Sequence, residues 1–393
     1  MPEETNTSYR TFIRNFYLFR FFNDFAFVYA VYIILFKLNG RSVLEISLLL
    51  ALWCGFVVLF EVPTGALADR WNRKYMLSLG MFSKAVGFGI WLFADSFWLF
   101  ACGFLFWGIQ ETFCSGTMEA LLFDNLKDFK EEEAYEKVAG RGHFYSRIAI
   151  ATSTFLGGFL ASISFDLVIV LSCISMIFAF VPTLFFREIR FSNQLTDRVK
   201  YIQVLKRAYQ ESLRNKTIFR LLLYTAAVLA VFGTLDEYEQ LYFNWVNLPI
   251  AFFGVLMVLR MSLEAIGCRI AHRFQGYNKN TNNIYILAIF SGIFLASSVA
   301  HQSLYMLPVF ALVFLFGSMG EVLVEGRLQR NIASDQRATV LSINSFLLNA
   351  SAIVLVVGFG ILSEIGQLTW GFLAFASLVI LFSMISMIFK TNE

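Results

Sequence analysis

The chain has 393 residues, of which 58% are hydrophobic and only 15% are charged, and its formal net charge is +3. Soluble domains carry about 25% charged residues, so this composition excludes a disordered chain, a nucleic-acid-binding protein and an ordinary soluble enzyme. It favours a polytopic membrane protein. The five cysteines are scattered without a CxxC motif, and we interpret them as small apolar residues rather than metal ligands. We expect no cofactor.

Twelve apolar runs approach or exceed the length that a helix needs to cross the hydrocarbon core, about 20 residues. None shows the alternating pattern of a membrane-spanning strand, so the predicted fold class is all-α with 12 transmembrane helices. In chain order the predicted spans are 12–38, 43–67, 75–94, 97–124, 141–163, 166–186, 217–240, 249–273, 284–300, 304–326, 337–363 and 367–389.

The longest connection between spans, 187–216, is basic and polar. It divides the chain into two predicted six-helix bundles, 1–186 and 217–393. Its helical periodicity over 199–213 fits either an amphipathic helix on the membrane surface or a plain tether. Lysine and arginine gather after the even-numbered spans and are nearly absent after the odd ones. Because basic loops stay in the cytoplasm, this pattern places both termini there, and we expect a multi-pass protein of the bacterial inner membrane.

The two halves repeat weakly. Glu119 and Glu321 lie 202 residues apart, near equivalent ends of spans 4 and 10. Arg337-x4-Ser342 opens span 11 as Arg141-x4-Ser146 opens span 5, and an eleven-residue segment beginning at Glu61 is matched by one beginning at Glu264. Together these matches indicate a duplicated six-helix unit. Parallel repeats of this kind are a transporter architecture, with the substrate site between the halves.

A charged motif, Gly65-Ala-Leu-Ala-Asp69-Arg70-Trp-Asn-Arg73-Lys74, follows span 2. Glycine lets helices approach closely, and Asp69 at a helix end can accept bonds from a neighbouring helix N-terminus. Arg73 can pair with a carboxylate on another helix, for which Asp124 is the natural candidate. Such a cluster would latch one conformation and release in the other.

This motif resembles the loop 2–3 signature of the major facilitator superfamily, although Asn72 stands where the signature has glycine. Through span count, topology and half repeat, the resemblance covers essentially the whole chain. It implies the fold of that superfamily, a charge relay of Asp69, Arg73 and Asp124, and a helix start at Arg337 that receives Asp69. We add Glu119 and Glu321 to this predicted latch.

Two departures distinguish the chain from the drug–proton antiporters of the superfamily. Thr112 stands where they usually carry a proton-relay arginine, and the Gly157-Gly158 segment lacks their proline. The segment 115–124 instead resembles a group of poorly characterised bacterial members, a resemblance that implies no particular substrate.

A charged side chain within the membrane is energetically unfavourable unless it has a partner or faces a water-filled cavity. The predicted cavity residues are Arg20, Asn23, Asp24, Glu111, Arg260 and Glu264. Arg20 and Asp24 lie one turn apart and can pair, and Asp24 is either a protonation or substrate site or part of a neutralised pair. Lys84 is interpreted as structural. Asp236, Glu237 and Glu239 are interpreted as a solvated helix end, with an outer gate as the alternative.

We predict a monomeric secondary transporter that works by alternating access, moves a small organic or amphiphilic solute and is driven by protons. Asp24 is the first candidate for the titrating group and Glu111 the second. Export is favoured over uptake of a small metabolite. The alternative from another functional class is a receptor or sensor that has the same fold but does not transport. The expected partners are the solute, protons and the bilayer, without nucleic acid.

Overall fold

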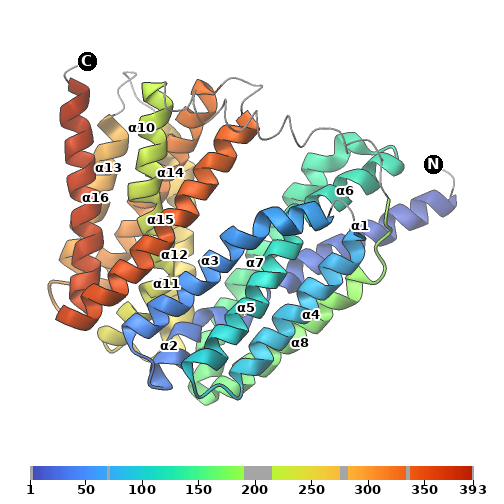
Figure 1. Ribbon diagram of the computed structural model, residues 1–393, viewed down its shortest axis with the longest axis horizontal. Helices are drawn as coiled ribbons and strands as arrows, with labels where there is room; N and C mark the ends of the chain where they lie inside the picture. Colours follow the sequence, from blue (N-terminus) through green and yellow to red (C-terminus); the bar gives the residue numbers. More distant parts are fainter. Residues whose placement is uncertain (1–2, 69–70, 190–214, 275–281, 333–336, 392–393) are drawn as a thin grey trace. The chain divides into compact units, whose positions relative to one another are not determined.

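The computed structural model describes residues 3–68, 71–189, 215–274, 282–332 and 337–391, and within these ranges the regular structure is entirely helical (Figure 1). The α-helices are α1 (Glu3–Asp24), α2 (Tyr32–Leu38), α3 (Val43–Ala68), α4 (Arg73–Trp91), α5 (Phe97–Cys114), α6 (Thr117–Asp128), α7 (Tyr135–Ile163), α8 (Phe165–Thr183), α10 (Lys216–Tyr224), α11 (Ala230–Trp245), α12 (Phe253–Ile270), α13 (Asn282–Ser298), α14 (Leu307–Asn331), α15 (Arg337–Gly366) and α16 (Leu368–Thr391). Short helical turns η1 (Phe27–Ala30), η2 (Glu132–Ala134), η3 (Thr225–Leu229), η4 (Ile250–Phe252), η5 (Ala271–Phe274) and η6 (Leu304–Met306) join or extend them.

Ten helical segments of the described chain are long and apolar enough to cross a membrane. The remaining two predicted spans are helical as well, since α4 occupies the third and α13 the ninth. Helix α13 is short, with 17 residues, and α4 carries the buried Lys84 and begins with two basic residues. Each predicted span therefore coincides with helix, and the prediction of an all-α polytopic protein is confirmed.

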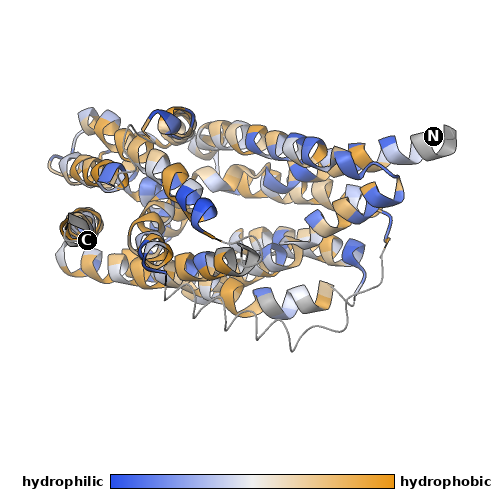
Figure 2. Ribbon diagram, turned by 90° about the horizontal axis from the view of Figure 1, so that it is seen from above, coloured by the Kyte–Doolittle hydropathy of each residue, from blue (hydrophilic) through white to orange (hydrophobic). Residues whose placement is uncertain are grey.

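Large apolar side chains lie on the outside of the helices. Leu59, Val354 and Ile365 each expose more than two thirds of their surface. Hydrophobic residues predominate along the helices in Figure 2. Water-soluble monomers rarely expose so much contiguous apolar surface, whereas in a bilayer these side chains contact lipid.

The chain forms two compact units, each with its own core. The first comprises Met1–Arg41, Leu52–Asn193 and Pro249–Met257, and the second comprises Ser42–Ala51, Gln194–Leu248 and Val258–Glu393. Short pieces of α3 and α12 thus belong to the unit that contains the other half of the sequence. Most of the predicted central loop, including 199–213, lies outside the described residues, so the division at 187–216 stays a prediction.

Aromatic residues build the core of the first unit. Phe12, Phe16 and Phe19 of α1 are almost fully buried and pack with Met118 and Leu122 of α6. Their spacing of three to four residues places them on one face of α1. That face fixes the rotation of α1, so Asp24 and its neighbours are presented to α4, α5 and α7.

Two predicted spans are interrupted. The first, predicted as continuous over 12–38, ends its first helix at Asp24 and continues through η1 into α2. The fourth, predicted over 97–124, breaks between α5 and α6 at Gly116, whose φ is +69°. Glycine adopts this left-handed conformation without the steric penalty of other residues, which explains why the break occurs there. Asp124 therefore lies on a separate helix from Glu111.

Stacked aromatic rings hold the core of the second unit. Tyr238 stacks on Phe359 with ring centroids 3.8 Å apart, and Tyr242 stacks on Phe310 at 4.0 Å. The Tyr238 hydroxyl lies 2.6 Å from the hydroxyl of Ser47, so the polar tip of this buried ring is satisfied. Buried tyrosines of this kind need such a partner.

Helix α7 approaches the interrupted first span closely at Gly157. A Cβ atom there would clash with the carbonyl oxygen of Phe27 and lie 3.0 Å from the Cβ of Ala30. We therefore expect Gly157→Ala to lower the stability of the purified protein by about 1–3 kcal/mol through overpacking. Gly89→Ala is the control, because nothing lies within 4 Å of a Cβ at that position. Equal thermal unfolding temperatures for the two variants in detergent would contradict the close approach.

Candidate functional site

The interruption of the first span is held by side chains from α4 and α8. A helix end leaves backbone groups without partners, and in a membrane these must be satisfied by protein. The Lys84 ammonium donates to the carbonyl oxygen of Asn23 at 3.2 Å, and the Ser175 hydroxyl donates to that of Phe22 at 3.2 Å. The backbone amide of Val28 donates to the Ser172 hydroxyl at 3.1 Å. Discontinuous helices supported in this way form binding sites in transporters.

Asp24, the last residue of α1, lies at the centre of a hydrogen-bond network. The side-chain amide of Asn23 donates to its Oδ1 atom at 2.7 Å, and the Ser146 hydroxyl of α7 donates to Oδ2. Gln110 of α5 donates in turn to the Oδ1 atom of Asn23, at 3.1 Å. The predicted residues Asn23 and Asp24 are thus brought together, joined by two residues that were not predicted as part of the site.

The donors around Asp24 are neutral. A carboxylate accepts hydrogen bonds only, whereas the protonated acid must also donate one. The Ser146 hydroxyl can turn round and accept that bond, since a hydroxyl both donates and accepts. The amide nitrogen of Asn23 can only donate, so it continues to hold the other oxygen. Rotation of one hydroxyl therefore keeps both Asp24 oxygens hydrogen-bonded in either form of the group, the carboxylate or the neutral acid.

Lys84 lies beside this network and is almost fully buried, with 2% of its surface exposed. Its ammonium lies 5.3 Å from the ring centroid of Tyr29 and 5.6 Å from that of Trp107, a cation–π arrangement. It is within electrostatic range of both Asp24 and Glu111. One cation therefore faces two carboxylates, and the three groups carry a net charge of −1 when all are ionised.

Arg20 does not pair with Asp24, contrary to the prediction. Its guanidinium lies 3.0 Å from Nδ1 of His143 on α7 and 3.8 Å from the carboxylate of Glu119 on α6. The reason is the packing of α1, which lets the long arginine side chain reach both of these helices, while Asn23 and Ser146 occupy the Asp24 oxygens. The contact between Arg20 and Glu119 joins a predicted cavity residue to a predicted latch residue.

A second charged cluster surrounds Arg260 in the second unit. Its guanidinium contacts the carboxylates of Asp236 at 2.9 Å, Glu239 at 2.7 Å and Glu264 at 2.5 Å. It also lies over the Phe314 ring, 4.6 Å from the centroid. Arg260 and Glu264, both predicted as cavity residues, form a pair one turn apart on α12.

The interpretation of Asp236, Glu237 and Glu239 as a solvated helix end is wrong for Glu239, whereas Asp236 keeps 45% of its side chain exposed and Glu237 is partly exposed. The Glu239 side chain is 1% exposed and that of Arg260 is 6% exposed. The reason is helical spacing, because residues three apart on α11 share a face, and here that face turns toward Arg260 on α12. A cluster with one cation and three carboxylates has a formal charge of −2.

The predicted latch is described in part. Arg73, the first residue of α4, pairs with Asp124 of α6 at 2.5 Å, and both side chains are about five-sixths buried. Gly65 is exposed on α3. Asp69 and Arg70 lie outside the described residues, as does the side chain of Arg337, the first residue of α15.

The other two latch candidates are on the surface. Glu119 has about half of its side chain exposed, and Glu321 is an exposed residue of α14. Among the described residues, no group of histidine, cysteine and carboxylate side chains is arranged to hold a metal ion.

Comparisons with known proteins identify similar chains. The family model described as Major Facilitator Superfamily matches residues 16–354. A tetracycline resistance protein, class H, of Pasteurella multocida is 22% identical over 350 residues, covering 86% of this chain and 84% of its own. An uncharacterised transporter of Buchnera aphidicola is 23% identical over 321 residues, covering 78% of each chain.

Solved structures show the same fold. The nucleoside transporter NupG superimposes with a TM-score of 0.76 at 12% identity, covering 98% of both chains. A bacterial homologue of the human lysosomal transporter Spinster, in an inward-facing and occupied conformation, gives 0.73 at 13% identity, covering 100% of this chain and 98% of its own.

Proposed function

Because the chain belongs to the major facilitator superfamily and is therefore a membrane transporter rather than an enzyme, we propose that it exports a small organic or amphiphilic solute in exchange for protons. The two predicted bundles, 1–186 and 217–393, would alternate access to a central site. The observation that carries proton coupling is the Asp24 carboxylate at the interruption of α1, held by neutral donors, one of which can reverse.

Export is supported by one of the relatives, which is named for resistance to tetracycline, a property consistent with removal of a compound from the cell. The positive charges after even-numbered spans support cytoplasmic termini in a bacterial inner membrane. We further propose that the transporter works as a monomer, since each compact unit has its own core within one chain.

Transport itself is tested with cells that contain the chain and cells that contain the empty vector. A panel of toxic compounds and a profile of metabolites inside and outside the cells identify the solute. That solute is then offered to everted membrane vesicles with an acidic interior. We expect accumulation that stops when the pH gradient is collapsed. Movement in the opposite direction would indicate uptake, and no difference from the vector would favour a receptor.

The latch role of Arg73 and Asp124 is a separate part of the proposal. Arg73→Gln is expected to slow transport about tenfold, because a charge-assisted bond of about 1.5 kcal/mol changes the ratio of two conformations by that factor. Arg187→Gln is the matched control, since its pair with Asp128 is longer, 3.7 Å, and more exposed. Equal slowing in the two variants, at equal amounts of folded protein, would argue against a latch.

A further inference from the structure

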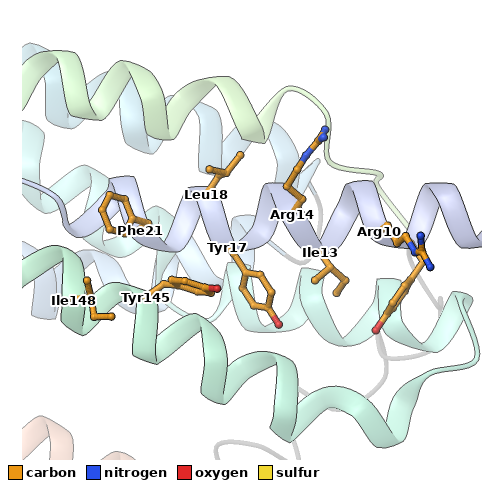
Figure 3. A pocket seen from close by; sticks show the side chains of 9 residues that line it. Arg10, Ile13, Arg14, Tyr17, Leu18, Phe21, Tyr145 and Ile148 are labelled. Carbon is orange, nitrogen blue, oxygen red and sulfur yellow. The ribbon is translucent and has the colours of Figure 1, made fainter.

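A cavity of about 630 Å³ lies between α1 and α7 in the first unit (Figure 3). It is lined on α1 by a stripe that includes Arg10, Arg14, Tyr17 and Phe21, residues separated by three or four positions. The same spacing places the buried phenylalanines Phe12, Phe16 and Phe19 on the opposite side of the helix. The cavity therefore faces away from the core of the unit, and Asp24 does not line it.

One end of the cavity is basic. Arg10 and Arg14 are exposed, and among the described side chains no carboxylate lies within ion-pair range of either. Arg141 of α7 lies close to Tyr17 and Tyr9, and Glu131 is the acidic residue near Tyr9. Three arginines and one glutamate give this end a formal charge of +2, which complements a phosphate group.

The other end of the cavity is apolar. Leu18 and Phe21 of α1 and Ile148 of α7 line it, and Leu18 and Ile148 are each about 40% exposed. Figure 3 shows Arg10 and Arg14 toward the N-terminal end of α1, and Phe21 and Ile148 at the opposite end. A ligand that fits the whole cavity has a negatively charged head and an apolar tail.

The length of the first span is compatible with a basic end of the cavity at the lipid headgroup region. The first span extends over Thr7–Leu38, 32 residues, of which only about 20 are needed to cross the hydrocarbon core. A surplus at the N-terminal end would put Arg10 and Arg14 at the level of the headgroups, where long basic side chains reach phosphate, and Phe21 and Ile148 at the level of the acyl chains. Basic pockets between transmembrane helices bind anionic headgroups in this way.

We propose that this cavity binds an anionic phospholipid of the surrounding membrane. Its phosphate lies between Arg10 and Arg14, and the first part of one acyl chain lies along Leu18, Phe21 and Ile148. The tyrosines Tyr17 and Tyr145, whose rings are tilted against each other with centroids 5.1 Å apart, lie between the two ends and contact the glycerol region. The inference is independent of which solute is transported and of proton coupling.

Native mass spectrometry of the full chain in detergent tests the site. Phosphatidylglycerol and phosphatidylethanolamine with identical acyl chains are offered together in equal amounts. We expect preferential retention of one phosphatidylglycerol molecule. Arg10→Gln with Arg14→Gln should weaken this preference about 30-fold, since each basic residue near a membrane surface contributes about 1 kcal/mol. Ile148→Trp, which fills the apolar end without a change of charge, should also reduce retention.

The control removes the same charge elsewhere. Arg273→Gln with Arg330→Gln alters two exposed arginines that do not line the cavity, one in η5 and one near the end of α14, on the same predicted membrane side. Retention by this variant should equal that of the wild type. The proposal is overturned if the control loses the preference as strongly as the cavity variant, because binding would then reflect total charge. It is also overturned if the wild type shows no preference, or if Ile148→Trp binds normally.

Discussion

Asp24→Asn is expected to abolish proton-driven transport while leaving the protein folded. Asparagine keeps an Oδ1 atom that can accept from Asn23, and its new amide can donate to the Ser146 hydroxyl after that hydroxyl turns. The side chain no longer titrates, so no proton can accompany the conformational change. We expect accumulation against a gradient to fall at least about 100-fold, the scale on which loss of one positioned proton-transfer group acts.

Exchange of solute across the membrane separates this role from a structural one. Exchange of labelled for unlabelled solute requires no net movement of protons, so Asp24→Asn should retain it. Asp166→Asn, at the exposed start of α8, is the matched control and should pump like the wild type. If Asp24→Asn pumps normally, the coupling group is another carboxylate, and Glu111 is the next to test. If exchange is lost together with pumping, Asp24 contributes to binding or folding instead.

The helices of this protein could be predicted from the sequence because each apolar run is long and bounded by charge. Membrane helices satisfy their own backbone hydrogen bonds, so their existence depends little on neighbours. The interruptions of the first and fourth spans are harder to predict from the sequence. The first span contains neither glycine nor proline between Arg20 and Leu38, and its break depends on Lys84, Ser172 and Ser175 from other helices. The break at Gly116 has a local signal in the sequence, since glycine is the residue that adopts a positive φ most readily.

The candidate site was harder to predict because its contacts join distant segments. Asp24 could be singled out as a charge within a span, but Ser146 and Gln110 are ordinary polar residues more than 80 positions away. Sequence spacing favoured a pair of Arg20 with Asp24, and the packing of α6 and α7 around α1 produced other partners. Where both partners follow a known signature, as for Arg73 and Asp124, the contact could be anticipated.

The second prediction with a large effect concerns Arg260, the single cation among three carboxylates. Arg260→Met preserves much of the side-chain volume and its contact with Phe314, but it leaves Glu239 buried without a cation. Removal of one partner from a buried ion pair destabilises by about 3–5 kcal/mol, because the remaining charge has lost both water and its partner. For a unit of this size we expect the unfolding temperature to fall by roughly 10 °C.

Two further variants distinguish this cause from a simple loss of packing. Arg260→Met combined with Glu239→Gln removes the buried carboxylate as well and should recover about half of the lost stability, since the uncompensated charge is gone. Arg269→Met changes an exposed arginine of the same helix and should unfold at the wild-type temperature. Thermal unfolding of the four proteins in one detergent gives the comparison. If Arg260→Met unfolds at the same temperature as the wild type, the cluster does not stabilise the second unit. If the double variant is no more stable than Arg260→Met alone, the loss of stability arises from packing around Phe314 rather than from an unpaired charge.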